Sequence, residues 1–227
     1  MTLNVVGVVC ALASEARHVR PSDAVRVALS GMGGAAATQS ARGLVEAGAQ
    51  ALVSFGMAGG LDPALAPGTV FFPSEVMSPD GGAIIATDES WREQVGARVA
   101  SQPVMGGRLV TTSKAVGTRA DKARLFAQTG AAAVDMESLA IAEVARSQGL
   151  PFIAIRVIVD GAADTLPPVV TAAADAEGHL QIGRLLGALA RQPGELPALI
   201  RLGQRYRAAN RSLAAVALVG LSGGTVG

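Results

Sequence analysis

The sequence predicts an α/β fold, because short apolar runs alternate with segments of helical periodicity. The clearest stretch begins with an apolar strand over Ala131–Val134, and a helix follows whose apolar residues recur every three or four positions. Gly149 and Pro151 close that helix. Phe152–Val159 is then an almost unbroken apolar run, as in a strand that is covered on both faces. Two buried strands therefore flank one helix.

The rest of the chain continues this alternation without an internal repeat or linker. Its 227 residues are enough for a substantial core, so we expect one domain over residues 1–221 and a disordered tail over residues 222–227. Further strands are expected over residues 4–10, 25–30, 51–55, 70–77 and 107–112, with a hairpin over 79–86. Further helices are expected over residues 88–100, 119–128, 180–190 and 196–213. The helix over 119–128 is charged, which predicts a solvated face that includes Lys122.

The composition excludes several classes of function. A charged fraction of 16% and a net charge of +1 give no electrostatic footprint for nucleic acid. The single cysteine, Cys10, can form no intrachain disulfide, which fits a reducing compartment. His18 and His179 lie far apart without companion cysteines, so no metal site is predicted. No apolar stretch reaches the roughly 18 residues of a membrane span, and Val5–Ala13 lacks the basic flank of a signal peptide. A cytoplasmic protein is expected.

Carboxylates stand where the two buried strands end. Asp135 and Glu137 follow the first strand, with Met136 between them, and Asp160 ends the second. Ligands of open α/β sheets bind outside the carboxyl ends of the strands, so these side chains are candidates for one site. The alternative is that each is a helix cap or a turn residue. Arg156 interrupts the second apolar run, which predicts a paired partner inside the fold.

Two segments near the N-terminus are also candidates. Glu15 follows the opening strand, in a short helix for which Ser14 is a plausible N-cap; an acid there also favours the helix dipole. The segment Gly31–Ala36 reads G-x-G-x-x-A between a strand and a helix, which formally matches a dinucleotide site and would indicate an NAD-dependent oxidoreductase. That interpretation requires an acid about 20 residues further on, and none stands between Gln50 and Gly60.

Together these motifs resemble the purine nucleoside phosphorylases and nucleosidases. Val134–Ser138 (V-D-M-E-S) with Arg156–Asp160 (R-V-I-V-D) is similar to V-E-M-E-(A/S) … R-x-x-S-D of that superfamily. Val6–Glu15 reproduces the spacing of I-G-I-I-x-A-x-x-x-E. Residues 30–33 resemble S-G-I-G, and residues 56–60 resemble G-S-A-G-G. The resemblance implies a three-layer αβα sandwich with a mixed central sheet.

The resemblance also implies an enzyme that cleaves the N-glycosidic bond of a purine nucleoside, without a cofactor. Asp160 would be the general acid at the base, and Glu15 would help to activate the acceptor. Glu137 would accept hydrogen bonds from the ribose hydroxyls. The residues implied to line the substrate site are Met136, Asp135, Ser30, Gly31, Gly56, Met57, Ala58, Gly59 and Val116.

The sequence departs from the superfamily pattern at four positions in these motifs. Met57 stands in place of a serine, and the hydroxyl of Ser54 could replace the one that is lost. Val116 stands where many relatives stack a phenylalanine on the purine. Val159 and Asp135 replace a hydrogen-bonding residue and a glutamate. The acceptor stays open between water and inorganic phosphate, although Glu15 disfavours a phosphate dianion. A nucleoside-binding protein without activity is a further alternative.

The whole chain is most similar to the phosphorylase-like proteins of hopanoid biosynthesis, in particular at Pro167-Pro168 and over residues 193–197. This resemblance implies adenosylhopane or a related 5′-substituted adenosine as substrate. A lipid-linked nucleoside would need an apolar mouth, for which Thr165–Val170 and the apolar stripe of the last helix are candidates. The basic side of that helix could contact a membrane transiently. A homo-oligomer, dimer or trimer, is also expected.

Overall fold

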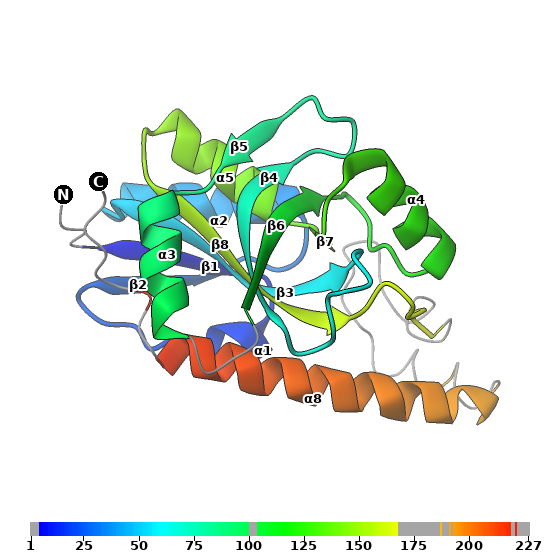
Figure 1. The fold of residues 1–227 in the computed structure, drawn as a ribbon. Coiled ribbons are helices and arrows are strands. Elements are labelled where there is room, and N and C mark those ends of the chain that lie inside the picture. Colours follow the sequence, from blue (N-terminus) through cyan, green and yellow to red (C-terminus); the bar gives the residue numbers. More distant parts are fainter. Residues whose placement is uncertain are drawn as a thin grey trace.

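The computed structural model describes residues 5–99, 104–167, 187, 191, 193–218 and 221. The expected helix over 180–190 and the expected tail over 222–227 lie outside the described residues, apart from the single residue Gly187. Eight strands form one mixed sheet (Figure 1). They are β1 (Val6–Cys10), β2 (Val25–Leu29), β3 (Ala51–Gly60), β4 (Val70–Met77), β5 (Ile84–Ala86), β6 (Val104–Thr111), β7 (Ala133–Asp135) and β8 (Phe152–Asp160).

The sheet closes on itself around β3, the longest strand. The strand order is β2-β1-β3-β7-β6-β4-β5, and β8 pairs with both β3 and β4. β3 runs parallel to β1 along its first part and parallel to β8 from Leu52 to Gly59, while Gly59 and Gly60 pair antiparallel with β7. A register shift between Ala58 and Gly59 interrupts the pairing with β8. The ring β3–β7–β6–β4–β8 brings the ends of β3, β7 and β8 together.

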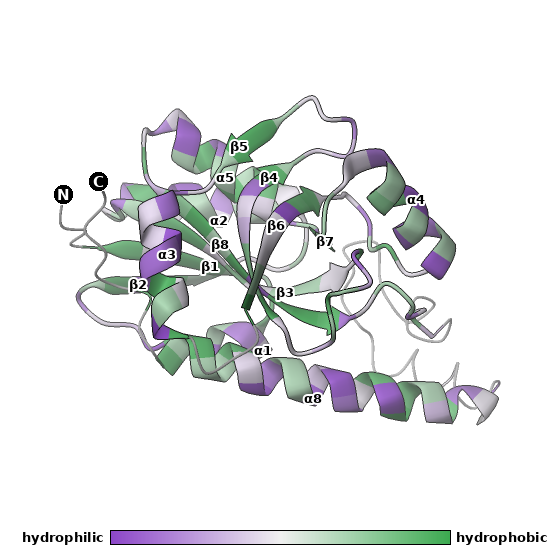
Figure 2. Cartoon of the chain, in the orientation of Figure 1, coloured by the Kyte–Doolittle hydropathy of each residue, from purple (hydrophilic) through white to green (hydrophobic). Residues whose placement is uncertain are grey.

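Helices cover both faces of the sheet. The helices are α1 (Ala13–Ala16), α2 (Gly34–Glu46), α3 (Glu89–Arg98), α4 (Arg119–Thr129), α5 (Ser138–Ser147) and α8 (Leu196–Leu218), with a 3-10 turn over Pro193–Glu195. α2 and α5 pack on one face, while α3 and α8 pack on the other (Figure 1). Most strand residues are apolar, although β4 and β6 also carry polar residues, and the helices combine polar with apolar residues (Figure 2). The predicted αβα architecture with a mixed central sheet is confirmed.

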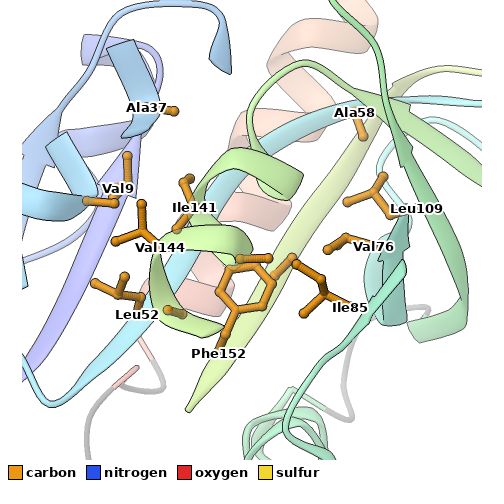
Figure 3. Packing of buried hydrophobic residues seen from close by; sticks show 14 of the residues in the cluster. Val9, Ala37, Leu52, Ala58, Val76, Ile85, Leu109, Ile141, Val144 and Phe152 are labelled. Atoms are coloured by element: carbon orange, nitrogen blue, oxygen red, sulfur yellow. The ribbon is translucent and has the colours of Figure 1, made fainter. Parts of the chain in front are cut away.

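Two apolar clusters hold these layers together. One cluster packs α2 and α5 on the sheet, with Ile141 and Val144 of α5 beside Leu52 and Phe152 (Figure 3). The other joins α3 and α8 to the opposite face through residues such as Trp91. Burying one valine, leucine, isoleucine or phenylalanine side chain stabilises a fold by about 1.5–3 kcal/mol.

Two local predictions, at residues 56–60 and at Ser14, differ from the structure, and a third, at residue 88, agrees with it. The strand expected over residues 51–55 continues to Gly60 as β3, because residues 56–60 pair with β8 and β7. Ser14 is not an N-cap: α1 begins after Leu12, and the hydroxyl of Ser14 accepts a hydrogen bond from Tyr206 of α8 at 2.5 Å. Asp88 is the first residue of the expected helix over 88–100, and it caps α3, since its carboxylate accepts from the Trp91 amide at 2.8 Å.

Candidate active site

A cavity of about 180 Å³ lies where β3, β7 and β8 end. Nine of the twelve residues proposed from the sequence line it: Glu15, Met57, Ala58, Gly59, Val116, Asp135, Met136, Glu137 and Asp160. The other lining residues are Ala11, Leu12, Met32, Thr112, Ala115, Val134, Val159 and Leu166. The cavity wall thus combines four carboxylates with apolar side chains, and it contains no basic and no aromatic side chain from the described part of the chain.

Glu15 is buried at one end of the cavity and is held by the backbone. Its Oε1 accepts from the Met57 amide at 3.0 Å, and its Oε2 accepts from the amides of Ala11 and Leu12 at 3.1 and 3.0 Å. Burial raises the pKa of Glu15, while Arg156 and these amides oppose the rise. The side chain is therefore fixed in place and suited to accept a proton from a bound water.

Three predicted site residues do not reach the cavity wall. Gly56 lies directly behind Glu15, since a Cβ atom placed on Gly56 would be 2.7 Å from Oε1. Because glycine has no Cβ atom, Gly56 leaves room for the carboxylate of Glu15. That carboxylate fills the space in which a ligand would have to contact Gly56. The Ser30 hydroxyl donates to the carbonyl oxygen of Gly31 at 2.7 Å, within the turn after β2. Ser30 and Gly31 therefore shape the turn that brings Met32 to the cavity.

Asp135 is engaged by Arg156, which confirms the paired partner predicted for this arginine. Its Oδ2 accepts from Nε and Nη2 of Arg156 at 2.9 and 2.7 Å, and its Oδ1 accepts from the Thr111 hydroxyl at 2.6 Å. Arg156 also donates to the hydroxyls of Ser54 at 2.5 Å and Ser138 at 2.9 Å. Burial opposes the charge of Arg156, but the carboxylates of Asp135 and its neighbours outweigh burial and raise its pKa.

This network settles the direction of Ser54. The Ser54 side chain is fully buried and faces Arg156 and Ser138 in the interior, not the cavity. The expectation that Ser54 replaces the hydroxyl lost at Met57 is therefore wrong. Arg156 makes its contacts on the same interior side, and its side chain does not line the cavity.

The carboxylate of Glu137 lies at the N-terminus of α2, although Glu137 itself precedes α5. Its Oε1 accepts from the Gly33 amide at 2.8 Å, where Gly33 is the N-cap of that helix. Burial and the nearby charge of Asp135 raise the pKa of Glu137 to about 7. A dinucleotide would place its pyrophosphate at such a helix end. Because a carboxylate already faces this end and β2 is at the edge of the sheet, the oxidoreductase alternative finds no support.

Asp160 ends β8 and is paired with a lysine that the sequence did not reveal. Nζ of Lys122 forms an ion pair with Oδ2 of Asp160 and donates to the carbonyl oxygen of Gly161 at 2.8 Å. Lys122 is fully buried, so the expected solvated face of α4 does not include it. Burial raises the pKa of Asp160, and Lys122 opposes that rise. Among the described residues, no cluster of His, Cys, Asp and Glu could hold a metal ion.

The fold and the cavity define an α/β protein with a set of buried carboxylates at its strand ends, and the comparisons name the family. The phosphorylase superfamily model matches residues 21–188, so the chain belongs to the phosphorylase superfamily. The predicted class, an enzyme of the nucleoside phosphorylase and nucleosidase type, is confirmed at this level. No curated protein sequence matches the chain significantly.

Solved structures share the fold over nearly the whole chain. The 5′-methylthioadenosine/S-adenosylhomocysteine nucleosidase of Neisseria meningitidis has a TM-score of 0.73 and 20% identity, covering 96% of this chain and 98% of that one. The futalosine hydrolase of Helicobacter pylori has a TM-score of 0.69 and 16% identity, covering 94% and 97%. A putative nucleosidase of Francisella philomiragia has a TM-score of 0.71 and 18% identity, covering 96% and 98%.

The packing of Gly56 against Glu15 gives a first prediction. Gly56→Ala should lower the free energy of unfolding by about 1–3 kcal/mol, the usual cost of overpacking, because the carboxylate and its three backbone donors have to move. Gly43→Ala is the matched control, since a Cβ atom at this helical position meets nothing within 4 Å. That control should stabilise by about 0.5–1 kcal/mol. Urea unfolding measures both, and equal effects of the two changes would contradict the packing argument.

The raised pKa of Glu137 predicts a pH-dependent stability. A buried carboxyl whose pKa rises from its ordinary value of 4.5 to about 7 in the folded chain favours folding below pH 4.5, and this contribution is lost as the pH rises through 7. Glu137→Gln keeps an acceptor for Gly33 but removes the titration, so its stability should fall less between pH 4.5 and 7. Thermal unfolding at several pH values measures this, with exposed Glu143→Gln as control. Parallel curves for the parent and Glu137→Gln would refute the assignment.

Proposed function

We propose that the chain hydrolyses the N-glycosidic bond of a purine nucleoside, an adenosine substituted at its 5′ position. The observation that carries this proposal is the cavity wall, on which Glu15, Asp135, Glu137 and Asp160 stand without a basic side chain from the described residues. Buried carboxyls with raised pKa values can donate and accept protons near neutral pH. Such a set suits a reaction in which a base leaves and a water attacks.

Each carboxyl then has a separate task. As the C1′–N9 bond breaks, its electron pair leaves with the purine, and N7 of the purine takes a proton from Asp160. The water oxygen forms the new bond to C1′ and gives a proton to Glu15, which lines the cavity. Glu137 accepts hydrogen bonds from the ribose hydroxyls, and Met136 packs against the sugar. Asp135 accepts two hydrogen bonds from Arg156, and its task is to keep that arginine in place.

Water is favoured over phosphate as the acceptor by the placement of the basic groups. A phosphate dianion needs arginine or lysine donors close to it. Nε and Nη2 of Arg156 donate to Asp135, Ser54 and Ser138 on its interior side, and Arg156 does not line the cavity. Met57 offers no hydroxyl, and Glu15 would repel the anion. The names of the three structural relatives, two nucleosidases and a futalosine hydrolase, describe hydrolytic enzymes and support this choice.

The finer proposal is that the 5′ substituent is large and apolar, as in adenosylhopane. The resemblance to the hopanoid-associated proteins motivates it, and apolar side chains such as Leu12, Met32, Val116 and Leu166 on the cavity wall support it. A cavity of about 180 Å³ is smaller than the roughly 300–1,000 Å³ of pockets that enclose a drug-sized ligand. A hopanoid group therefore has to extend out of the cavity beside Leu166.

Three expectations about the surroundings stay predictions: a cytoplasmic location, a homo-oligomer and a transient membrane contact. No helix in the described part of the chain is long and apolar enough to span a bilayer. On α8, Leu196 and Ile200 are half exposed, whereas Ala209, Leu213 and Val216 are buried against the sheet. The exposed N-terminal half of this helix is the part that could meet a lipid surface.

The acceptor is tested by product analysis. With 5′-methylthioadenosine and longer 5′-alkylthio adenosines, the parent should release adenine and the free sugar at a rate that does not change with added phosphate. Asp160→Asn should be slower by about 10² or more, the scale for removal of a general acid. Formation of a sugar 1-phosphate, or a strict need for phosphate, would overturn the choice of water. Binding of the analogues without any turnover would indicate the inactive nucleoside-binding alternative.

The 5′ substituent is tested by chain length. In the parent, kcat/KM for 5′-alkylthio adenosines should rise with the length of the alkyl chain, because each buried CH₂ contributes about 0.8 kcal/mol. Leu166→Gln should flatten this rise, whereas Leu218→Gln, at the exposed end of α8, should leave it unchanged. Truncation before Leu196 is unsuitable, since it removes the core residues of α8. A preference of the parent for 5′-methylthioadenosine over all longer analogues would exclude the hopanoid substrate.

A further inference from the structure

We propose that Lys122 is a positioning residue for the general acid: it holds Asp160 by one carboxyl oxygen and leaves the other oxygen for the departing base. The proposal rests on the proposed N-glycosidic cleavage, in which Asp160 protonates the purine. It assigns a task to a side chain that lies behind the cavity wall and contacts no ligand itself.

The burial of Lys122 is the first argument. Its side chain has no exposed surface, although α4 also carries the exposed residues Arg119 and Arg124. Burying an ammonium group costs several kcal/mol unless it is paired and hydrogen-bonded. An apolar residue of similar volume would pack this face of α4 without that cost. The chain has 19 Lys and Arg residues, and only Lys114 and Lys122 are lysines. One of these two lysines occupies this fully buried position.

The partners of Lys122 are the second argument. Nζ contacts Oδ2 of Asp160 and the carbonyl oxygen of Gly161, and thus clamps the last residue of β8 and the first of the following loop. In the described part of the chain no hydrogen bond reaches Oδ1 of Asp160, and Asp160 lines the cavity. The loop is fixed further by Asp164, which accepts from the Gly161 amide at 2.9 Å and pairs with Arg205 of α8 at 2.7 Å.

The charge of Lys122 is the third argument. When the carboxyl of Asp160 gives its proton to N7 of the purine, a carboxylate forms beside the ammonium group, which stabilises it as the C1′–N9 bond breaks. Solvent later returns the proton. Burial raises the pKa of Asp160, and Lys122 opposes this rise more than any other neighbour. The other charged groups around Asp160 are Asp164 of the loop and Arg205 of α8, and Glu15, Asp135 and Glu137 across the cavity. Arg119 of α4, Glu195 and Arg201 line a second cavity together with Asp160.

Lys122 also affects how the rate of the proposed reaction depends on pH. Asp160 acts in its protonated form, so the rate falls as the pH rises through its pKa, which gives the alkaline limb of the profile. Removing the ammonium group takes away the influence that lowers this pKa. The alkaline limb should therefore move to higher pH, while the rate below it falls because the carboxyl is less well placed and its anion is less stable. A lysine that only supported the fold would not move this limb.

The experiment compares Lys122→Met with the exposed control Lys114→Met on a 5′-alkylthio adenosine. Lys122→Met should lower kcat about 10- to 100-fold, less than the roughly 10²–10⁴-fold of general acid catalysis because Asp160 itself is kept. It should change KM much less and move the alkaline limb of kcat upward. The control should match the parent. In an Asp160→Asn background, Lys122→Met should cost little more, because both changes remove the same interaction.

Lys122→Gln covers the case in which the methionine variant does not fold, since its amide keeps a hydrogen-bond donor but removes the charge; the same loss and the same shift are expected. A kcat within about twofold of the parent, with an unmoved limb, in a folded Met or Gln variant would overturn the proposal. Base release by the parent tests the proposed function by itself. A parent without base release would refute that function, whereas an active parent with equally active Lys122 variants would refute only the role of Lys122.

Discussion

The ion pair between Arg156 and Asp135 is the interaction on which the site depends. It joins β8 to β7, and the hydroxyls of Ser54 and Ser138 extend it to β3 and to the start of α5. A guanidinium group in this interior is tolerated only because each of these partners is present, and loss of one partner of a buried pair typically costs about 3–5 kcal/mol. The same contacts keep the charge of Arg156 away from the cavity, which leaves the cavity wall to carboxylates.

This placement divides the carboxyl groups into two kinds. Asp135 and Asp160 have cationic partners in Arg156 and Lys122, whereas Glu15 and Glu137 are held by backbone amides. In the proposed reaction, these different surroundings separate the tasks of chemically similar groups, so that an acid and a base can act in one cavity at the same pH. Close approach of the backbone is part of the arrangement, because Gly56 leaves just enough room for the carboxylate of Glu15.

Much of the fold could be predicted from the sequence because its signals are local. The apolar run before Asp160, the cap at Asp88 and the turn through residues 79–82 each depend on neighbours in the chain, and the structure has all three. The rest depends on contacts between distant segments. Nothing near Lys122 shows that its helix faces the end of β8, and nothing near Ser54 shows that Arg156 lies on its side of β3. From the sequence, the strand is expected to end at residue 55, because the partners of residues 56–60, β7 and β8, come far later in the chain.

The most direct test of the account is a crystal structure of the protein with a non-cleavable adenosine analogue, grown in the presence of phosphate. The account predicts a water molecule between Glu15 and the anomeric carbon, N7 of the base next to Asp160, and Arg156 still bound to Asp135. A phosphate ion at the anomeric carbon, held by an Arg156 that has turned away from Asp135, would contradict it.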